Sequence, residues 1–150
     1  SFIVYQGDLL GKPHTPEQCE KMLTLLNGKT HDVITGYTVI DTQSGKRLSR
    51  SIVTKVHFKK LALKEIRAYI KTGEPLDKAG AYAIQGLGAG FVEGIEGDYL
   101  NVVGLPLFAL CESLKGFGVN VSGVGSTHFR KNLKCVDPTP LADLQLDSDS

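Results

Sequence analysis

The side chains best suited to binding a charged ligand gather in residues 72–86, which read TGEPLDKAGAYAIQG. Asp77, Lys78 and Gln85 alternate there with Ala and Gly, as in a loop whose backbone approaches a ligand closely. The amide of Gln85 offers one acceptor and two donors, which match the carbonyl and imide N–H edge of a uracil or thymine ring. Lys12, at the end of an expected strand, offers a point charge for a phosphate. These residues predict a nucleotide pocket.

Each of these residues also has an ordinary structural interpretation. Asp77 could cap a short turn beside a solvated Lys78, and Gln85 could satisfy backbone groups. Lys12 could be a surface lysine. The carboxylate of Glu74 fits a cap, a turn or the surface as readily as a catalytic role, so residue types alone leave these alternatives open.

Two glycine-containing segments resemble phosphate-binding motifs and fail the spacing test. Residues 28–30 (GKT) end like a P-loop, but the earlier glycine would fall on Leu23, and a helix precedes them where a strand is required. Residues 86–90 (GLGAG) lack the third glycine of a dinucleotide fold, because that position is Phe91. The sequence therefore predicts neither a P-loop nor a dinucleotide-binding fold at these segments.

Composition narrows the class of protein. The chain has 150 residues, 17 basic and 16 acidic side chains, and 41% hydrophobic residues. A net charge of +1 argues against binding to nucleic acid polymers or membranes by bulk electrostatic attraction. Three cysteines without a C-x-x-C pair and four scattered histidines predict neither a disulfide framework nor a zinc site, and no apolar run approaches the ~20 residues of a membrane helix. A cytoplasmic location is expected.

A helix is predicted over residues 16–26. Thr15 supplies an N-cap hydroxyl, Pro16 suits the first helical position, and Gln18 stands at the capping-box position. Apolar residues then recur at helical spacing, and residues 27–28 (NG) are a typical end.

Further elements follow from periodicity. Residues 2–5 predict a strand, and residues 33–41 and 48–58 a long antiparallel hairpin, because apolar and polar side chains alternate in its second half. Helices are expected over 63–70 and 107–114, although residue 62 is an alanine and provides no cap. The resulting class is α/β with mixed α+β character.

Five segments in one collinear order resemble the Maf family of nucleoside triphosphate pyrophosphatases. The resemblance covers residues 1–116, with the matching segments at residues 9–13 (LLGKP), 25–28 (LLNG), 31–36 (HDVITG), 72–86, and 97–107 (GDYLNVVGLPL).

This resemblance implies a fold and an activity. The fold would be an elongated mixed sheet with flanking helices, its N-terminal portion missing, over residues 1–118. Residues 119–150 would form a partly disordered tail. The activity would be hydrolysis of a nucleoside triphosphate to the monophosphate and pyrophosphate with Mg²⁺ or Mn²⁺, in a cytoplasmic homodimer. An alternative is a non-catalytic nucleotide-binding or interaction module.

The resemblance also implies which residues meet the substrate. Lys12 and Gln85 match the branch that acts on dTTP and UTP, including modified pyrimidine nucleotides, and Asp77 and Lys78 fall in its most specific segment. The family's catalytic aspartate is expected immediately before Ser1, and Ser1 takes the position of a threonine that influences substrate choice. No residue of this chain is assigned as the catalytic base or a metal ligand.

Overall fold

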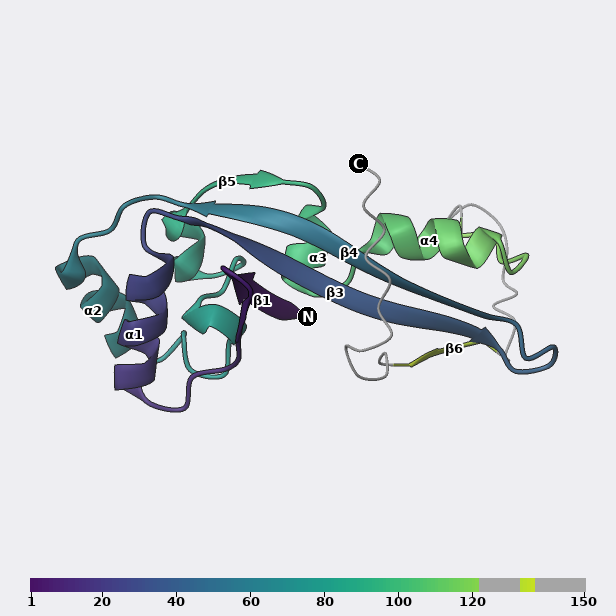
Figure 1. Cartoon of the computed structure of the whole chain (residues 1–150), viewed down its shortest axis with the longest axis horizontal. Coiled ribbons are helices and arrows are strands. Elements are labelled where there is room, and N and C mark those ends of the chain that lie inside the picture. The colour runs from purple at the N-terminus through teal and green to yellow at the C-terminus, as the bar shows by residue number, and fades with distance from the viewer. Residues whose placement is uncertain (122–132, 137–150) are drawn as a thin grey trace. The chain divides into compact units, whose positions relative to one another are not determined.

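The protein is described by a computed structural model that covers residues 1–121 and 133–136 (Figure 1). The chain divides into two compact units. The first unit consists of Ser1–Ile34 and Val53–Leu105, and the second of Thr35–Ile52 and the chain from Pro106 onward. Most of the predicted tail, residues 119–150, lies outside the described residues.

The sheet is built from antiparallel neighbours in the order β2-β1-β3-β4-β5, and β6 also pairs with β3. The strands are β1 (Phe2–Tyr5), β2 (Asp8–Leu10), β3 (Thr30–Asp41), β4 (Arg47–Phe58), β5 (Val92–Glu96) and β6 (Leu133–Val136). Helices accompany this sheet, so the predicted mixed α+β class is confirmed. No helix in the described part of the chain is both long and apolar enough to cross a membrane.

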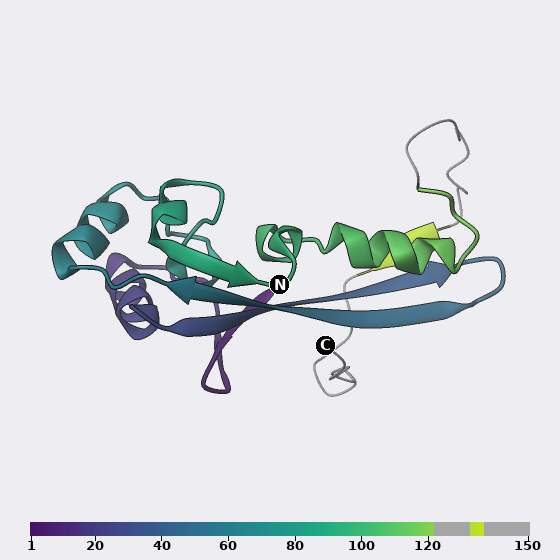
Figure 2. The same cartoon turned by 90° about the horizontal axis from the view of Figure 1, so that it is seen from above.

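Strands β3 and β4 form the predicted hairpin and run side by side in both views (Figure 2). The alternation in β4 has the predicted consequence: Thr54, Val56 and Phe58 are buried, whereas Lys55 is exposed. At the turn, the two carboxylate oxygens of Asp41 accept hydrogen bonds from the next few residues, which holds the chain in its reversal.

Helix α1 (Pro16–Leu26) begins and ends where the sequence predicts. The Thr15 hydroxyl accepts a hydrogen bond from the backbone N–H of Gln18, at 3.3 Å. The reciprocal bond differs from the expected box, because Gln18 Oε1 accepts from the N–H of His14 rather than of Thr15, at 2.7 Å. Cys19 is fully buried on the inner face of the helix, where it acts as a small core residue.

Helix α2 (Leu63–Lys71) lacks a capping hydroxyl and is held at its start by other groups. Glu65 Oε2 accepts a hydrogen bond from the N–H of Ala62, at 2.7 Å. One residue earlier, the amide of Asn27 pairs with both backbone groups of Leu61, at 2.7 and 2.9 Å. The end of α1 is therefore fastened to the entry of α2 within the first unit.

Aromatic rings fill the core of the first unit beside these helices. His31, Phe58 and Tyr82 meet edge to face, with ring centroids 4.7–5.5 Å apart. Tyr69 packs in the same manner on Phe91, at 4.8 Å. Edge-to-face contacts of this kind stabilise a core beyond the area they bury.

The second unit has its own small core beneath α4 (Leu107–Lys115). Tyr37, Val39 and Leu110 are buried there, and the Tyr37 hydroxyl is 2.8 Å from Ser113 Oγ. Cys111, on α4, is half-buried, whereas Cys19 in the first unit is fully buried.

Several short elements were not predicted from the sequence. Strand β2 and the 3₁₀ helix η1 (Ala79–Ala81) have three residues each, while the 3₁₀ helix η2 (Leu87–Phe91) and helix α3 (Tyr99–Val103) have five. Segments of this length carry too few residues to show a period. Two of them, η1 and α3, nevertheless contribute residues to the pocket wall described next.

Candidate functional site

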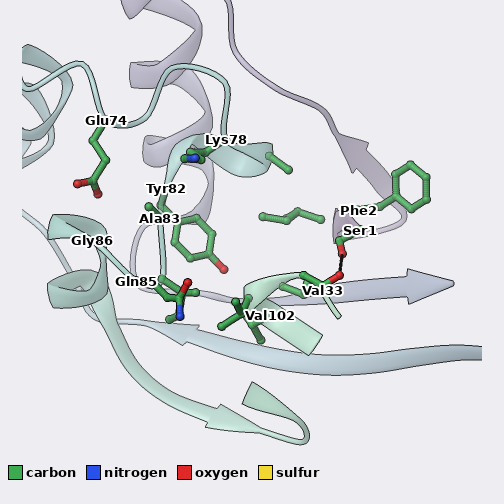
Figure 3. A pocket seen from close by; sticks show the side chains of 15 residues that line it. Ser1, Phe2, Val33, Glu74, Lys78, Tyr82, Ala83, Gln85, Gly86 and Val102 are labelled. Carbon is green, nitrogen blue, oxygen red and sulfur yellow. Dashed lines mark hydrogen bonds between the residues drawn. The ribbon is translucent and has the colours of Figure 1, made fainter. Parts of the chain in front are cut away.

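A pocket of about 440 Å³ lies in the first unit (Figure 3). It is lined by the first residues of β1, by Val33 of β3, by α3 and Gly104, and by residues of the 74–86 segment. Its volume falls within the range of about 300–1,000 Å³ that is typical of small-molecule sites. The segment singled out in the sequence is therefore one wall of a cavity.

Three of the five predicted binding residues line this pocket. Ser1, at the start of the sequence, is brought together with Lys78 and Gln85, which lie near its middle (Figure 3). The Ser1 hydroxyl donates a 3.4 Å hydrogen bond to the carbonyl of Gly104. Lys12 and Asp77 are not part of the lining. The binding roles of all five remain predictions.

The polar ends of Gln85 and Lys78 are available to a ligand. Gln85 is exposed, and its amide makes no hydrogen bond within the described residues. Lys78 is also exposed and forms no ion pair with the part of the chain that is described. This differs from the alternative interpretation of Gln85, in which its amide would satisfy backbone groups.

Lys12 is held next to the pocket segment by its backbone. The N–H of Gly80 donates to the carbonyl of Gly11, at 3.1 Å, so the LGKP turn and the DKAGAY segment are in contact. Gly80 has a φ of +68°, and a Cβ there would lie 2.5 Å from Cδ1 of Ile3. A side chain at position 80 would thus disturb the contact between the two motifs.

Asp77 has the backbone of a turn residue. Its φ is +68°, in the left-handed region that Asp adopts more readily than most residues. The next residue, Lys78, is thereby turned to the pocket wall. This conformation favours the turn interpretation of Asp77.

Glu74 organises the pocket segment, a role that sequence reasoning missed. Its Oε1 accepts hydrogen bonds from the Tyr69 hydroxyl at 2.9 Å and the Gly88 N–H at 3.0 Å, and its Oε2 accepts from the Leu87 N–H at 3.0 Å. These donors, that of Gly88 foremost, lower the pKa of Glu74, so it is ionised at neutral pH. The Tyr69 hydroxyl in turn accepts from the Ala83 N–H, at 3.2 Å.

Two glycines leave the space that this carboxylate and phenol occupy. A Cβ at Gly86 would lie 2.6 Å from both oxygens of Glu74. A Cβ at Gly88 would lie 2.7 Å from the Tyr69 hydroxyl oxygen and 2.9 Å from the backbone N and O of Ala83. The glycines that resemble part of a dinucleotide-binding motif instead leave room for the side chains of Glu74 and Tyr69.

Tyr82 forms an apolar part of the lining and is anchored from behind. Its hydroxyl lies 2.9 Å from Nε2 of His31. Burial lowers the pKa of His31 to about 4, with a smaller contribution from His57, so the His31 ring is neutral at pH 7. Burial also raises the pKa of Tyr82, which keeps the phenol protonated. The pair therefore fixes the Tyr82 ring without placing a charge beneath the pocket.

The opposite wall, α3, is fastened to the hairpin by a buried polar network. Asp98 caps α3 by accepting from the N–H of Leu100, at 2.8 Å. The Thr54 hydroxyl donates to the Asp98 carbonyl at 3.0 Å and accepts from the Asp98 N–H at 3.2 Å. Asn101 Nδ2 donates to Thr54 and to the carbonyl of Val33, at 3.0 Å each. The GDYLN residues thus place α3 against β3 and β4.

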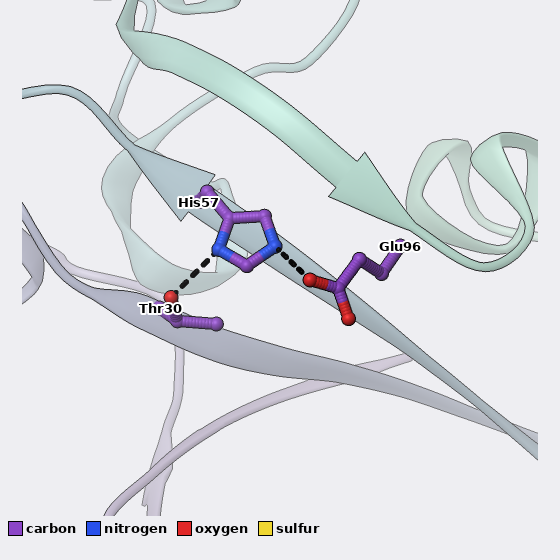
Figure 4. Close-up of polar contacts among 3 residues, drawn as sticks. All are labelled: Thr30, His57 and Glu96. Carbon is purple, nitrogen blue, oxygen red and sulfur yellow. Dashed lines mark hydrogen bonds and ion pairs between the residues drawn. The ribbon is translucent and has the colours of Figure 1, made fainter.

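A second polar chain has the residue types of a nucleophile triad but lies apart from the pocket lining. His57 Nδ1 is 2.7 Å from the Thr30 hydroxyl, and its Nε2 is 2.9 Å from Glu96 Oε1 (Figure 4). The three side chains link β3, β4 and β5 across the strands, and Thr30 and Glu96 are exposed. With none of them on the pocket wall, the arrangement fits a cross-strand polar contact.

The described residues do not fit a divalent metal on their own. Among them, no group of three His, Cys, Asp or Glu side chains is close enough to hold an ion. Glu74 is the one carboxylate among the residues that line the pocket, and its two oxygens already accept three hydrogen bonds. The described part of the chain therefore supplies no complete set of metal ligands.

Fold and pocket together define an α+β protein with a pocket that presents the amide of Gln85 and the ammonium group of Lys78, neither of which is paired with another side chain among the described residues. The model of the Maf-like protein family matches residues 1–117, so the chain belongs to the Maf family. The resemblance stated from the five segments is thereby confirmed.

Curated relatives support the same assignment. The chain is 55% identical over 119 residues to the dTTP/UTP pyrophosphatase of Methanosarcina barkeri. This alignment covers 79% of the present chain and 60% of the relative. The chain is 50% identical over 123 residues to the protein of the same name from Moorella thermoacetica, covering 82% and 63%. A third protein of that name, from Methanosarcina mazei, is 50% identical over 119 residues. The chain thus spans about 60% of the length of these relatives.

Proposed function

We propose that the protein is a nucleoside triphosphate pyrophosphatase that hydrolyses dTTP and UTP, or modified pyrimidine nucleotides, to the monophosphate and pyrophosphate. The observation that carries this proposal is the pocket that gathers Ser1, Lys78 and Gln85 within a chain of the Maf family. The names of the similar curated proteins support the choice of nucleotides.

In this proposal, Gln85 recognises the pyrimidine ring. Its amide lies on the pocket wall without a hydrogen bond to the described residues, so it can pair with the carbonyl and imide edge of uracil or thymine. The apolar side chains of Tyr82 and Val102 would flank the ring and exclude water from this pairing. A base with a different edge would leave the amide poorly matched, and that mismatch would weaken binding.

Lysines would neutralise the phosphates. Lys78 lines the pocket, and Lys12 is tied to the same segment through the hydrogen bond between Gly80 and Gly11. An ammonium group suits a phosphate as a point charge, and it stabilises the charge that develops as the bond between the α- and β-phosphates breaks. Ser1 lies across the pocket from Lys78 (Figure 3), at a position where it can influence substrate choice.

The test is release of pyrophosphate from UTP and dTTP by the protein made from its complete gene. We expect Gln85→Ala to lower kcat/KM for UTP roughly tenfold or more, since it removes up to two hydrogen bonds to the base. Lys12→Ala should lower turnover of every triphosphate, because phosphates are common to all of them. Lys21→Ala, at an exposed position of α1 outside the pocket lining, is the matched control. Unchanged rates in both pocket variants would refute the assignment.

Three further parts of the proposal rest on the family resemblance alone. A requirement for Mg²⁺ or Mn²⁺ is tested by chelation with EDTA and restoration with either ion in the same assay. A homodimer is tested by light scattering after size-exclusion chromatography. A cytoplasmic location is tested by cell fractionation. UTP binding without turnover in the presence of metal would instead favour the non-catalytic module.

A further inference from the structure

The segment that carries Gln85 is held at both ends by one pair of side chains. The N–H of Ala83, two residues before Gln85, donates to the Tyr69 hydroxyl at 3.2 Å. The N–H groups of Leu87 and Gly88, two and three residues after it, donate to the Glu74 carboxylate at 3.0 Å each. Within the described part of the chain, the side-chain hydrogen bonds to residues 83–88 all come from this pair, while Ile84 packs against the core. The pair therefore holds the backbone on both sides of Gln85.

Tyr69 and Glu74 are joined into one unit by their own hydrogen bond. The phenol donates to Oε1 at 2.9 Å, and its burial raises the pKa of Tyr69, so the donor keeps its proton. The same carboxylate receives backbone donors on both oxygens, which fixes its orientation as well as its charge. Movement of either side chain would therefore shift both ends of the segment together.

The two glycines show how tightly the pair is seated. The space that a Cβ would need at Gly86 is taken by the carboxylate of Glu74, and at Gly88 by the phenol oxygen of Tyr69. With glycine at both positions, the backbone passes close to the carboxylate and the phenol. Gln85 directly precedes the first of these glycines, so the position of its Cα is set by the same contacts.

We propose that Tyr69 and Glu74 are positioning residues for Gln85, and that they govern recognition of the pyrimidine base through it. This inference rests on the proposed function and adds a second layer to its site. Neither side chain needs to touch the base: the pair aims the amide, and the amide makes the contact. Loss of the pair should therefore weaken nucleotide binding while the bond-breaking step is largely preserved.

A double-mutant cycle on Tyr69→Phe and Gln85→Ala tests this inference, with kcat and KM for UTP measured on the protein made from its complete gene. We expect Tyr69→Phe to raise KM roughly five- to tenfold and to change kcat by less than about twofold. In the Gln85→Ala background the same change should have almost no further effect, because its target is already absent. A role that is only structural would lower activity equally in both backgrounds.

Controls separate positioning from damage to the fold. Tyr37→Phe also removes a buried phenol, but its hydroxyl binds Ser113 in the second unit, and we expect its KM to stay at the wild-type value. Equal losses from Tyr69→Phe with and without Gln85 would overturn the positioning role. If the wild type binds UTP but does not hydrolyse it, the proposed function fails, and the cycle is read in UTP dissociation constants with the same criterion. Absence of UTP binding by the wild type would overturn both.

Discussion

Removal of the charge on Glu74 is the perturbation whose consequence can be worked out furthest. Glu74→Gln keeps the shape of the side chain and one oxygen, which can still accept from Tyr69 and Gly88. The new NH₂ group replaces Oε2, so it faces the N–H of Leu87 as donor against donor. One charge-assisted hydrogen bond is lost, and the other two become neutral.

These changes set the size of the effect. Hydrogen bonds to charged groups contribute about 1.5–3 kcal/mol, against about 0.5–1.5 kcal/mol for neutral ones. Because Glu74 is only half-buried, solvent screening reduces the difference, and we expect the free energy of unfolding to fall by about 1–2 kcal/mol at pH 7. Glu93→Gln is the matched control, since the Glu93 side chain is exposed and forms no hydrogen bond or ion pair with the described residues.

The effect should depend on pH with a definite sign. The folded-state pKa of Glu74 is lowered, so its stabilising contribution is full above the unfolded pKa, near 4.3, and is lost as pH falls through the folded value. The difference in the free energy of unfolding between wild type and Glu74→Gln should therefore be constant near neutral pH and should disappear below about pH 4. Urea denaturation followed by circular dichroism measures it, since the sequence has no Trp. The reasoning would be refuted if Glu74→Gln lowered the free energy of unfolding no more than Glu93→Gln does, or if its effect grew on acidification.

Two other changes probe the walls of the pocket. Gly88→Ala places a Cβ 2.7 Å from the Tyr69 oxygen and should destabilise the protein by about 1–3 kcal/mol, whereas Gly90→Ala, with nothing within 4 Å, should change stability by less than about 0.5 kcal/mol. Equal melting temperatures for the two variants would contradict the packing argument. Thr54→Val removes three hydrogen bonds, two of them to Asp98, and should cost about 1–3 kcal/mol and raise KM for UTP as α3 loosens. A loss of stability with KM unchanged would show that α3 does not depend on this network.

Elements set by local signals could be predicted from the sequence. The cap at Thr15, the proline after it and the apolar spacing that follows all act within one helix, so α1 was predicted to the residue. The β3–β4 hairpin was predicted from alternation, although β3 begins at Thr30, three residues earlier than expected. The cause is His31, a polar side chain that is buried here against Tyr82 and Phe58 and so obscures the pattern.

The candidate site was predictable only in part. Resemblance to a family pointed to Ser1, Lys78 and Gln85, and in the structure all three line the same pocket. The role of Glu74 could not be read from residue types, because it depends on Tyr69 and on amides 13 and 14 residues further along the chain. The pair of glycines at 86 and 88 was the available signal, since small residues at alternate positions mark a close approach.

The seating of Glu74 and Tyr69 beneath Gly86 and Gly88 also limits how base preference can be redesigned. Substituting either glycine would displace the carboxylate or the phenol before it altered any contact with a nucleotide. Position 85 carries no such restriction, because its side chain is exposed and makes no hydrogen bond to the described chain. A library aimed at new nucleobases should therefore randomise residue 85 and hold 86 and 88 as glycine, so that each variant differs in what it recognises while the loop keeps its course.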